Sequence, residues 1–406
     1  MTDTAKVAGA LTDLLAASHI AVLGDLPEMV ASHADAVGLH GATFFLVDLQ
    51  GKVLRQVTGR GPDAGEGGLR LAADGTVAGL AFQRVDLVLE PRRTADWGLL
   101  RWWVPIVDGV ERLGVLRVDT ADDDEAVHDA LRNLASLVAL LLLSKRSHSD
   151  SYARLIRTAP MNVAAEMQWH LTPPSAFAGR NCTVGAVSEP AYEVGGDAYD
   201  YAVSGDTLHL SVFDAMGHDA TAGLTANIAV AACRNARRQG ADLVETGQAV
   251  EDVLIEQFGV SRYVTGILAH LDMGTGRLRW INRGHHLPVL IRDGRWSSEL
   301  RCPPAGPMGV GLRLPVTVCQ EQLQPGDRVL FYTDGVVEAR NGKGEQFGLE
   351  RFVDFVMRHH AGRLTLHETL RRLTHAILTH HGGRLDDDAT VLLAEWGDPD
   401  QGDLTP

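Results

Sequence analysis

Acidic residues in the second half of the chain recur in short motifs where apolar segments meet glycines. Asp197 follows a glycine pair in EVGGDAYD, Asp214 ends the apolar segment LHLSVFD, and Asp334 ends RVLFYTD. The motif DDDATVLL begins with Asp386, Asp387 and Asp388. A carboxylate in apolar surroundings needs a counter-charge, and Asp197 has no obvious basic partner nearby in the sequence. Because Mg²⁺ and Mn²⁺ prefer carboxylate, carbonyl and water oxygens, we expect the missing counter-charge to be a divalent metal ion.

Each acidic motif taken singly also has an ordinary structural explanation. GGD and TDG are common turn sequences, and three consecutive aspartates are typical of a solvated start of a helix or strand. The aspartate in VFDAMGH is more informative, because an Asp that ends an apolar strand is costly to bury unless it is paired. The ordered set of four motifs is therefore more specific than any one of them.

Residues 181–396 predict many strands with three helices between them. Apolar patterning marks the strands, which are LHLSVFDA, YVTGILAHLD, RLRWINR, LPVLIRDG, PVTVCQEQL, RVLFYTDG and ATVLLAEW. The helices are DATAGLTANIAVAACRNARRQ, GLERFVDFVMRHH and TLHETLRRLTHAILTHH. Antiparallel strands with helices inserted between them favour an α+β domain, a β-sandwich with helices outside. The acidic motifs would then lie where strands meet loops.

The first 120 residues predict a small α/β domain with an antiparallel sheet. One hairpin covers residues 42–59 and turns at Gly51, and another covers 99–120 and turns at Asp108-Gly109. Between them, LAADGTVAGLAFQRVDLVL predicts a short helix followed by a strand. The segments GATFFLVD, DGTVAGLAFQRVDLVL and VPIVDGVERLGVLRVDT make roughly the first 143 residues resemble a GAF sensor domain.

A heptad seam follows this domain and predicts a long helix. The seam consists of Val127, Leu131, Leu134, Val138 and Leu141, and its register continues through the polar segment KRSHSD. Two interpretations stay open: an apolar helix face packed on its own domain, or a parallel dimer stalk that joins two domains. The expected organisation is a sensor domain at 1–143, a helical stalk or linker at 122–175 overlapping the domain ends, a catalytic domain at 176–398 and a disordered tail at 399–406.

The ordered motifs make the chain from about residue 164 to 396 resemble the metal-dependent (PPM, 2C-type) protein serine/threonine phosphatases. Within them, it resembles the bacterial SpoIIE/RsbU-type branch. The motifs that carry this resemblance are AAEMQWHLTPP, EVGGDAYDY, VFDAMGHDATAGL, NRGHHLPVLIRDG, FYTDGVVEARN, FGLERF and DDDATVLL. The family fold, a pair of antiparallel sheets flanked by helices, agrees with the strands predicted above.

The resemblance implies two divalent metal ions, Mn²⁺ or Mg²⁺, and assigns their ligands motif by motif. These ligands are Asp197, Asp214, the backbone carbonyl of Ala215, Asp334 and Asp387. Asp214 would bridge both ions, Asp388 would orient the ligands, and Asp386 would lie on the surface. The four ligand aspartates are also the expected catalytic residues, because in this family the ions activate a water that attacks phosphorus. No protein nucleophile is then needed.

Four residues near these motifs have more than one possible role. Asp219 stands where the family usually has Gly, and it either caps the following helix or perturbs the metal site. Arg283 stands where a small residue is common, and it is either a surface arginine or a contact to the substrate phosphate. His218 and His285 are either structural loop histidines or general acids near neutral pH.

Composition argues against several classes of partner. A formal net charge of −15 disfavours nucleic acid and anionic membranes, since both demand basic surface. The cysteines show no CxxC spacing, so neither a zinc knuckle nor a disulfide framework is implied, and a reducing, cytoplasmic setting is expected. No signal peptide is apparent, and the longest apolar stretch, LASLVALLLL, is about half of what a bilayer span needs.

These observations favour a phosphoprotein phosphatase regulated by its GAF domain. For this branch the implied substrate is a phosphorylated STAS-domain anti-anti-sigma protein supplied in trans, whose dephosphorylated form would capture an anti-sigma kinase. The alternative is a catalytically weak or silent module of the same fold that sequesters a regulatory partner. A homodimer through the GAF domain and helical stalk is also expected.

Overall fold

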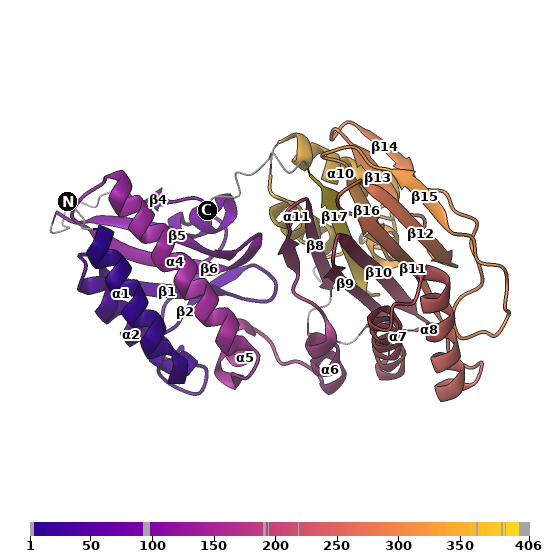
Figure 1. Cartoon of the computed structure of the whole chain (residues 1–406), viewed down its shortest axis with the longest axis horizontal. Helices are drawn as coiled ribbons and strands as arrows, with labels where there is room; N and C mark the ends of the chain where they lie inside the picture. The colour runs from indigo at the N-terminus through magenta and orange to yellow at the C-terminus, as the bar shows by residue number, and fades with distance from the viewer. Residues whose placement is uncertain are drawn as a thin grey trace. The chain divides into compact units, whose positions relative to one another are not determined.

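The chain divides into two compact units, with the border between Pro160 and Met161. The computed structural model describes residues 4–91, 98–189, 192–193, 195–217, 219–362, 364–382, 385 and 387–397. The border lies inside the segment expected as a helical linker. Unit 1, before the border, and unit 2, after it, each have their own sheets and core (Figure 1).

Unit 1 is built on a six-stranded antiparallel sheet with the order β3-β2-β1-β6-β5-β4. Its strands are β1 (His40–Val47), β2 (Val53–Gln56), β3 (Arg70–Ala72), β4 (Val88–Leu89), β5 (Leu100–Asp108) and β6 (Glu111–Thr120). Both predicted hairpins are confirmed, and their turns hold Gly51 and Gly109 at positive φ. Glycine suits such angles because it has no Cβ.

Helices cover both faces of this sheet. They are α1 (Thr4–Ala17), α2 (Leu26–Asp35), α3 (Val77–Arg84), α4 (Glu125–Arg146) and α5 (Asp150–Ile156). On one face, Phe82 of α3 packs into a core with Phe45 and Trp103. Phe44 and Leu46 point the opposite way, because successive strand residues alternate between faces. Both are fully buried, and α1, α2 and α4 lie on that side (Figure 1).

The heptad seam of α4 is buried within unit 1. Its buried residues include Val127, Leu131, Leu134, Val138 and Leu141. Lys145, also buried, donates a 2.9 Å hydrogen bond from Nζ to the carbonyl of Ser18. The helix ends at Arg146, and α5 begins after Ser149, whose hydroxyl accepts a hydrogen bond from the Tyr152 amide. The predicted long helix is therefore confirmed over the seam, but it does not continue through KRSHSD, and the seam packs on its own domain.

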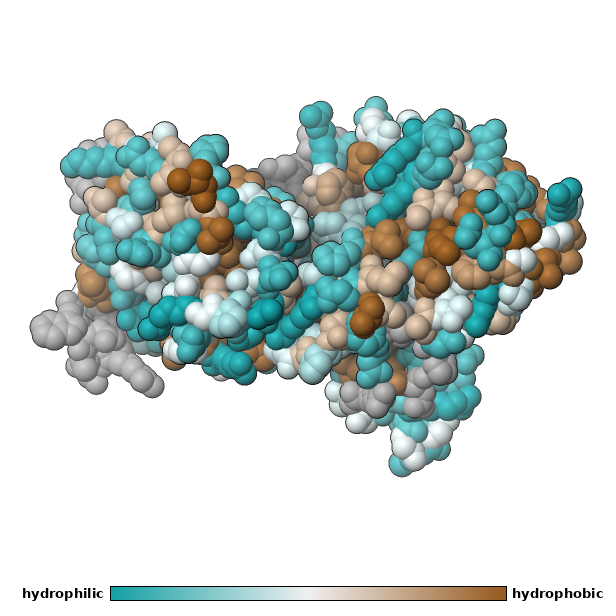
Figure 2. All heavy atoms as spheres, turned by 90° about the horizontal axis from the view of Figure 1, so that it is seen from below, coloured by the Kyte–Doolittle hydropathy of each residue, from teal (hydrophilic) through white to brown (hydrophobic). Residues whose placement is uncertain are grey.

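Helix α4 is the one helix of the described residues that is long and apolar enough to cross a membrane. Its most apolar window is 50% buried inside the protein, as in a helix that contributes to a core. Length and composition alone are therefore weak evidence for a membrane span here. The face of the protein shown in Figure 2 carries intermixed hydrophilic and apolar side chains.

Unit 2 is a sandwich of two antiparallel sheets. The five-stranded sheet has the order β15-β12-β11-β10-β9, and the six-stranded sheet has the order β14-β13-β16-β17-β8-β7. The strands are β7 (Ala176–Ala178), β8 (Cys182–Glu189), β9 (Asp197–Ser204), β10 (Thr207–Ala215), β11 (Val264–Asp272), β12 (Arg277–Arg283), β13 (Val289–Arg292), β14 (Trp296–Glu299), β15 (Cys319–Gln322), β16 (Arg328–Tyr332) and β17 (Ala389–Trp396). The α+β sandwich expected from the sequence is the observed fold.

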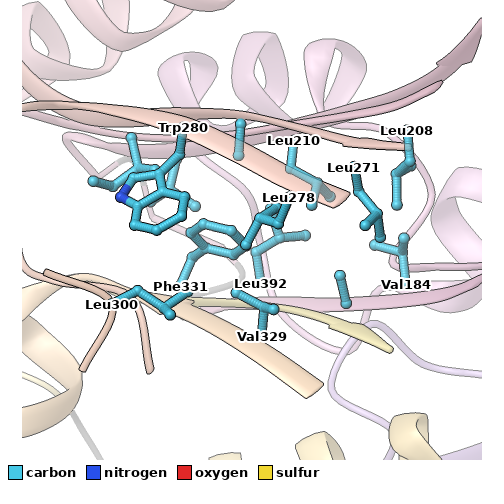
Figure 3. Packing of buried hydrophobic residues seen from close by; sticks show 14 of the residues in the cluster. Val184, Leu208, Leu210, Leu271, Leu278, Trp280, Leu300, Val329, Phe331 and Leu392 are labelled. Atoms are coloured by element: carbon cyan, nitrogen blue, oxygen red, sulfur yellow. The ribbon is translucent and has the colours of Figure 1, made fainter. Parts of the chain in front are cut away.

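The main core of unit 2 lies between the two sheets. Leu210, Leu271 and Trp280 from one sheet face Phe331 and Leu392 from the other (Figure 3). Two further apolar clusters place α7 and α8 outside the five-stranded sheet and α10 and α11 outside the six-stranded sheet. The helices of unit 2 are α6 (Val163–Leu171), α7 (Ala220–Arg238), α8 (Leu243–Phe258), α9 (Asp334–Glu338), α10 (Leu349–Ala361) and α11 (Leu366–His380).

Helix α8 was not predicted, although its sequence carries a start signal. The Asp242 side chain accepts hydrogen bonds from the amides of Val244 and Glu245, and the Glu245 carboxylate accepts one from the Asp242 amide. This reciprocal capping box is readable as an acidic residue followed three positions later by Glu.

A disulfide joins Cys302 to Cys319, whose Cα atoms are 5.8 Å apart. The sequence implied no disulfide, because this spacing matches no framework. The two cysteines meet because the intervening segment returns to the five-stranded sheet, where Met308 exchanges backbone hydrogen bonds with Val264. The strand expected over PVTVCQEQL is correspondingly short and begins only at Cys319.

Candidate active site

Asp197 and Asp214 lie opposite each other on neighbouring antiparallel strands. Asp197 begins β9 and pairs in register with Asp214 of β10, so both side chains leave the same face of the sheet. The backbone beside them is tightly packed, because a Cβ on Gly196 would lie 2.5 Å from the carbonyl oxygen of Ala215. The glycine therefore permits the close approach of this segment to the end of β10.

The other acidic motifs reach the same region from the six-stranded sheet. Asp334 begins α9 directly after β16, while Asp387 and Asp388 precede β17, the antiparallel neighbour of β16. A Cβ on Gly335 would lie 1.9 Å from the backbone oxygen of Asp388. The segment after β16 and the segment before β17 are thus in direct backbone contact, which only a glycine allows.

Asp197 is buried, with 2% of its surface exposed. Its carboxylate accepts a hydrogen bond from the Thr333 hydroxyl, and its amide donates one to the Asp388 carboxylate. Burial, followed by the charges of Asp388 and Asp214, raises the pKa of Asp197 well above its ordinary value. In the described part of the chain, no basic side chain forms an ion pair with it. Among the described residues, the fold therefore supplies no counter-charge for Asp197.

The neighbouring carboxylates raise one another's pKa values. Burial, Asp334, Asp388 and Asp387 together raise the pKa of Asp214 to about 7. Burial and Asp387 raise the pKa of Asp334. Burial and the hydrogen bond with Asp387 raise the pKa of Asp388 to about 6. These mutual effects place five carboxylates in one electrostatic neighbourhood that a cation would stabilise.

The oxygen donors of this set are of the type that binds a hard divalent cation, although they are not arranged as a complete coordination shell. Among the described residues, no three His, Cys, Asp or Glu side chains form a ready coordination group. Asp387 is exposed, and Asp388 is directed to the Asp197 amide. Carboxylate and carbonyl oxygens are nonetheless the ligands that Mg²⁺ and Mn²⁺ prefer. The structure thus brings the four predicted ligand aspartates and Asp388 together, while Asp386 lies outside the described residues.

The second aspartate of EVGGDAYD has a different environment. Asp200 is almost fully buried and accepts hydrogen bonds from Arg234 at 2.7 Å and from Arg237 at 2.8 Å. Arg234 also donates to the carbonyl of Leu171 at the end of α6. Asp200 is therefore a structural ion-pair residue that joins β9, α7 and α6.

Helix α6 also contacts the Asp197 segment directly. The Gln168 side chain donates a hydrogen bond to the Asp197 carbonyl and accepts a 3.5 Å hydrogen bond from the Gly195 amide. The sequence placed α6 in the helical stalk or linker expected at 122–175 but did not reveal the role of Gln168, because its partner lies 29 positions further along the chain. The first helix of unit 2 therefore helps to hold the segment that carries a predicted metal ligand.

His285 is a structural residue. Its Nε2 donates to the Tyr332 carbonyl at 3.1 Å, and its Nδ1 lies 2.9 Å from the Thr265 hydroxyl. Because a carbonyl only accepts, Nε2 carries the proton and Nδ1 accepts from Thr265. Burial lowers the pKa of His285 to about 4, so it is neutral at pH 7 and not placed to act as a general acid. His218 lies outside the described residues.

Two departures from the family pattern have structural explanations. The Asp219 carboxylate accepts a 2.8 Å hydrogen bond from the Ala222 amide and caps α7. Arg283 is neither a surface residue nor directed to a phosphate. It is buried, forms an ion pair with Glu251, and donates a 2.8 Å hydrogen bond to the Gly306 carbonyl. The expectation of a surface arginine is thus corrected.

Comparison with known proteins points to one family. Residues 204–397 match the family model "Stage II sporulation protein E (SpoIIE)". The chain is 20% identical over 236 residues to the phosphoserine phosphatase RsbU of Bacillus subtilis, covering 57% of this chain and 69% of that protein.

Two of the solved structures that are similar to part of this chain are the following. The RsbU and RsbW domains of Rv1364c from Mycobacterium tuberculosis match with a TM-score of 0.46 at 27% identity, covering 53% of this chain and 60% of that chain. The SiaA-PP2C domain of Pseudomonas aeruginosa matches with a TM-score of 0.49 at 22% identity, covering 58% of this chain and 94% of that chain. The family match and the acidic motifs thus make unit 2 similar to the SpoIIE family over residues 204–397.

Proposed function

We propose that unit 2 hydrolyses phosphoserine or phosphothreonine on a protein substrate with the help of two divalent ions, Mn²⁺ or Mg²⁺. The observation that carries the proposal is buried Asp197, which faces other carboxylates and has no cationic partner among the described residues. The ligands we assign are Asp197, Asp214, the carbonyl of Ala215, Asp334 and Asp387. Asp388 and Thr333 hold Asp197 in place through their hydrogen bonds.

Bound divalent ions would lower the pKa of water and offset negative charge on the phosphoryl oxygens. The chain's own residues supply the oxygen ligands and keep them in place. The free cysteines Cys182 and Cys233 are not suited to be nucleophiles, because burial raises the pKa of each thiol to about 11. This agrees with a reaction in which water is the nucleophile.

The substrate we infer is a phosphorylated STAS-domain protein, with activity regulated by the GAF-like unit 1. The likeness to RsbU, which is described as a phosphoserine phosphatase, supports the phosphoserine part of this proposal. The hydrogen bonds of Gln168 support regulation through α6, since they join the start of unit 2 to the Asp197 segment.

A phosphatase assay tests the proposal. The full chain is incubated with candidate phospho-STAS proteins and with p-nitrophenyl phosphate, with Mn²⁺ and with a chelator. We expect Mn²⁺-dependent phosphate release that Asp214→Ala abolishes, because this change removes the ligand that we assign to both ions. Asp197→Ala, Asp334→Ala and Asp387→Ala should each cost several orders of magnitude. Near wild-type turnover by Asp214→Ala would contradict the two-metal assignment.

The alternative function is sequestration of a phosphorylated partner by a catalytically weak or silent domain of the same fold. It predicts stable binding of the phosphoprotein and no metal-dependent release of phosphate from either substrate. The carboxylate cluster disfavours it, because a purely binding role gives no reason to bury Asp197 among other acids at an energetic cost.

A further inference from the structure

A cavity of about 450 Å³ lies beside the carboxylate cluster of unit 2. Asp334 begins α9, and Val337 and Glu338 at the end of this short helix line the cavity. The other walls come from the loop after β12, the ends of β14 and β16, and the segment that leads into α10. The cavity is distinct from the predicted metal ligands, none of which lines it.

The lining combines an aromatic wall, apolar side chains and two carboxylates. The ring of His286 stacks on Tyr332, with centroids 5.7 Å apart and an interplanar angle of 21°. Val337 and Leu349 add apolar surface, and Glu299 contributes a second carboxylate besides Glu338. In the described part of the chain, no Lys or Arg lines this cavity, and neither carboxylate forms an ion pair.

This chemistry is complementary to a long cationic side chain. Lysine and arginine place an apolar stem along hydrophobic surface while the charged end meets acidic or aromatic groups. The four helical steps from Asp334 to Glu338 rise about 6 Å, which is the length of about two residues of extended peptide. A residue two positions from the phosphorylated side chain would therefore reach the cavity.

We propose that this cavity is a specificity subsite for a lysine or arginine of the protein substrate, about two residues from the phosphoserine or phosphothreonine. The inference rests on the proposed function, because only a phosphorylated polypeptide presents both groups at once. It adds a substrate class to that function: phosphorylated sites flanked by basic residues.

The test uses three phosphoserine peptides that differ only at the residues two positions before and after the phosphoserine. These residues are Lys, Ala or Glu. With the full chain and Mn²⁺, kcat/KM is measured by phosphate release and normalised to that for p-nitrophenyl phosphate, which has no flanking residue. We expect the Lys peptide to exceed the Ala peptide by about three- to tenfold, as for a partly exposed charge pair. The Glu peptide should fall below the Ala peptide, and the differences should lie mainly in KM.

Charge variants separate the cavity from the net charge of the protein. Glu299→Gln with Glu338→Gln should bring the ratio of the Lys to the Ala peptide within twofold of one. Glu256→Gln with Glu350→Gln removes the same two charges from exposed residues that do not line the cavity, and it should keep the preference. Glu299→Lys should favour the Glu peptide. If the double variant also loses p-nitrophenyl phosphate hydrolysis, Glu299→Gln alone is compared in the same way.

The outcomes distinguish the subsite from the proposed function. A wild-type protein that hydrolyses all three peptides equally, or a preference that survives Glu299→Gln with Glu338→Gln, would overturn the subsite alone. No Mn²⁺-dependent release from any peptide or from p-nitrophenyl phosphate would instead contradict the phosphatase function.

Discussion

Asp197 and Asp200 lie three residues apart on β9 and bury their carboxylates in opposite surroundings. Asp200 meets two arginines of α7, whereas Asp197 meets Asp388 and Asp214. The fold therefore neutralises one carboxylate with its own residues and leaves the other to a different partner. Removing the charge of a carboxylate that has no basic partner should increase the stability of the metal-free protein. Removing the charge of a carboxylate in an ion pair should decrease it, and this difference distinguishes a binding site from a structural ion pair.

Asp214→Asn should stabilise the metal-free protein at pH 7.5 by up to about 4 kcal/mol. Because the pKa of Asp214 is raised to about 7, the folded state binds this proton more tightly than the unfolded state. The wild-type free energy of unfolding should accordingly fall as pH rises from about 4 to 7. Mn²⁺ should raise the melting temperature of the wild type and not that of the variant.

Urea denaturation of chelator-treated protein at pH 5.5 and 7.5 measures this difference. Asp206→Asn, on the exposed turn between β9 and β10, is the matched control and should leave the pH dependence unchanged. If Asp214→Asn destabilises the metal-free protein at pH 7.5, the carboxylate has a favourable partner within the chain and the site is structural.

Asp219→Asn tests the helix cap at the start of α7. Asn caps as well as Asp, so we expect phosphatase activity and its Mn²⁺ dependence to stay close to wild type. Asp219→Ala should cost about 1 kcal/mol of stability, because the Ala222 amide loses its acceptor. A Mn²⁺ titration and thermal unfolding measure the two effects, and a large shift in the Mn²⁺ requirement of Asp219→Asn would place the residue at the metal site.

At the scale of elements, α6 connects the start of unit 2 to the Asp197 segment through Gln168. Gln168→Ala removes both hydrogen bonds, and a lost hydrogen bond of about 1 kcal/mol corresponds to roughly fivefold in an equilibrium constant. We expect the Mn²⁺ concentration for half-maximal activity to rise by that factor. Met167→Ala, on an exposed position of the same helix, is the control. An unchanged Mn²⁺ requirement for Gln168→Ala would show that α6 does not support the site.

The helices and strands that could be predicted are those whose patterns lie within a short stretch of sequence. β17 matches the predicted ATVLLAEW, and the acidic motifs meet because they lie at ends of strands that pair. The break after α4 and the disulfide were not predicted. The break coincides with the local Ser149 cap of α5, whereas the disulfide depends on a distant contact, because Cys319 and Cys302 are 17 residues apart. Gln168 was missed and Arg283 was misassigned because their partners, Asp197 and Glu251, also lie far away in the sequence.

At the scale of the whole molecule, we predict a homodimer formed through unit 1. The heptad seam cannot be its contact surface while unit 1 stays folded, because Leu134 and Leu141 are already buried there. The contact on α4 must instead use its outer face, where Leu140 is 58% exposed. Leu140→Lys should therefore weaken the dimer without unfolding unit 1. Leu134→Lys should unfold it, because it buries a charge in the core.

Light scattering of the full chain at micromolar concentration, with circular dichroism of each variant, tests this model. We expect a dimeric wild type, a folded and more monomeric Leu140→Lys, and a destabilised Leu134→Lys. Because α4 is followed by α5 and then by α6, a change in pairing at α4 would reach Gln168 through a short run of chain. The Mn²⁺ requirement of Leu140→Lys should then differ from that of the wild type. A monomeric wild-type protein would refute the dimer and leave α4 as a core helix only.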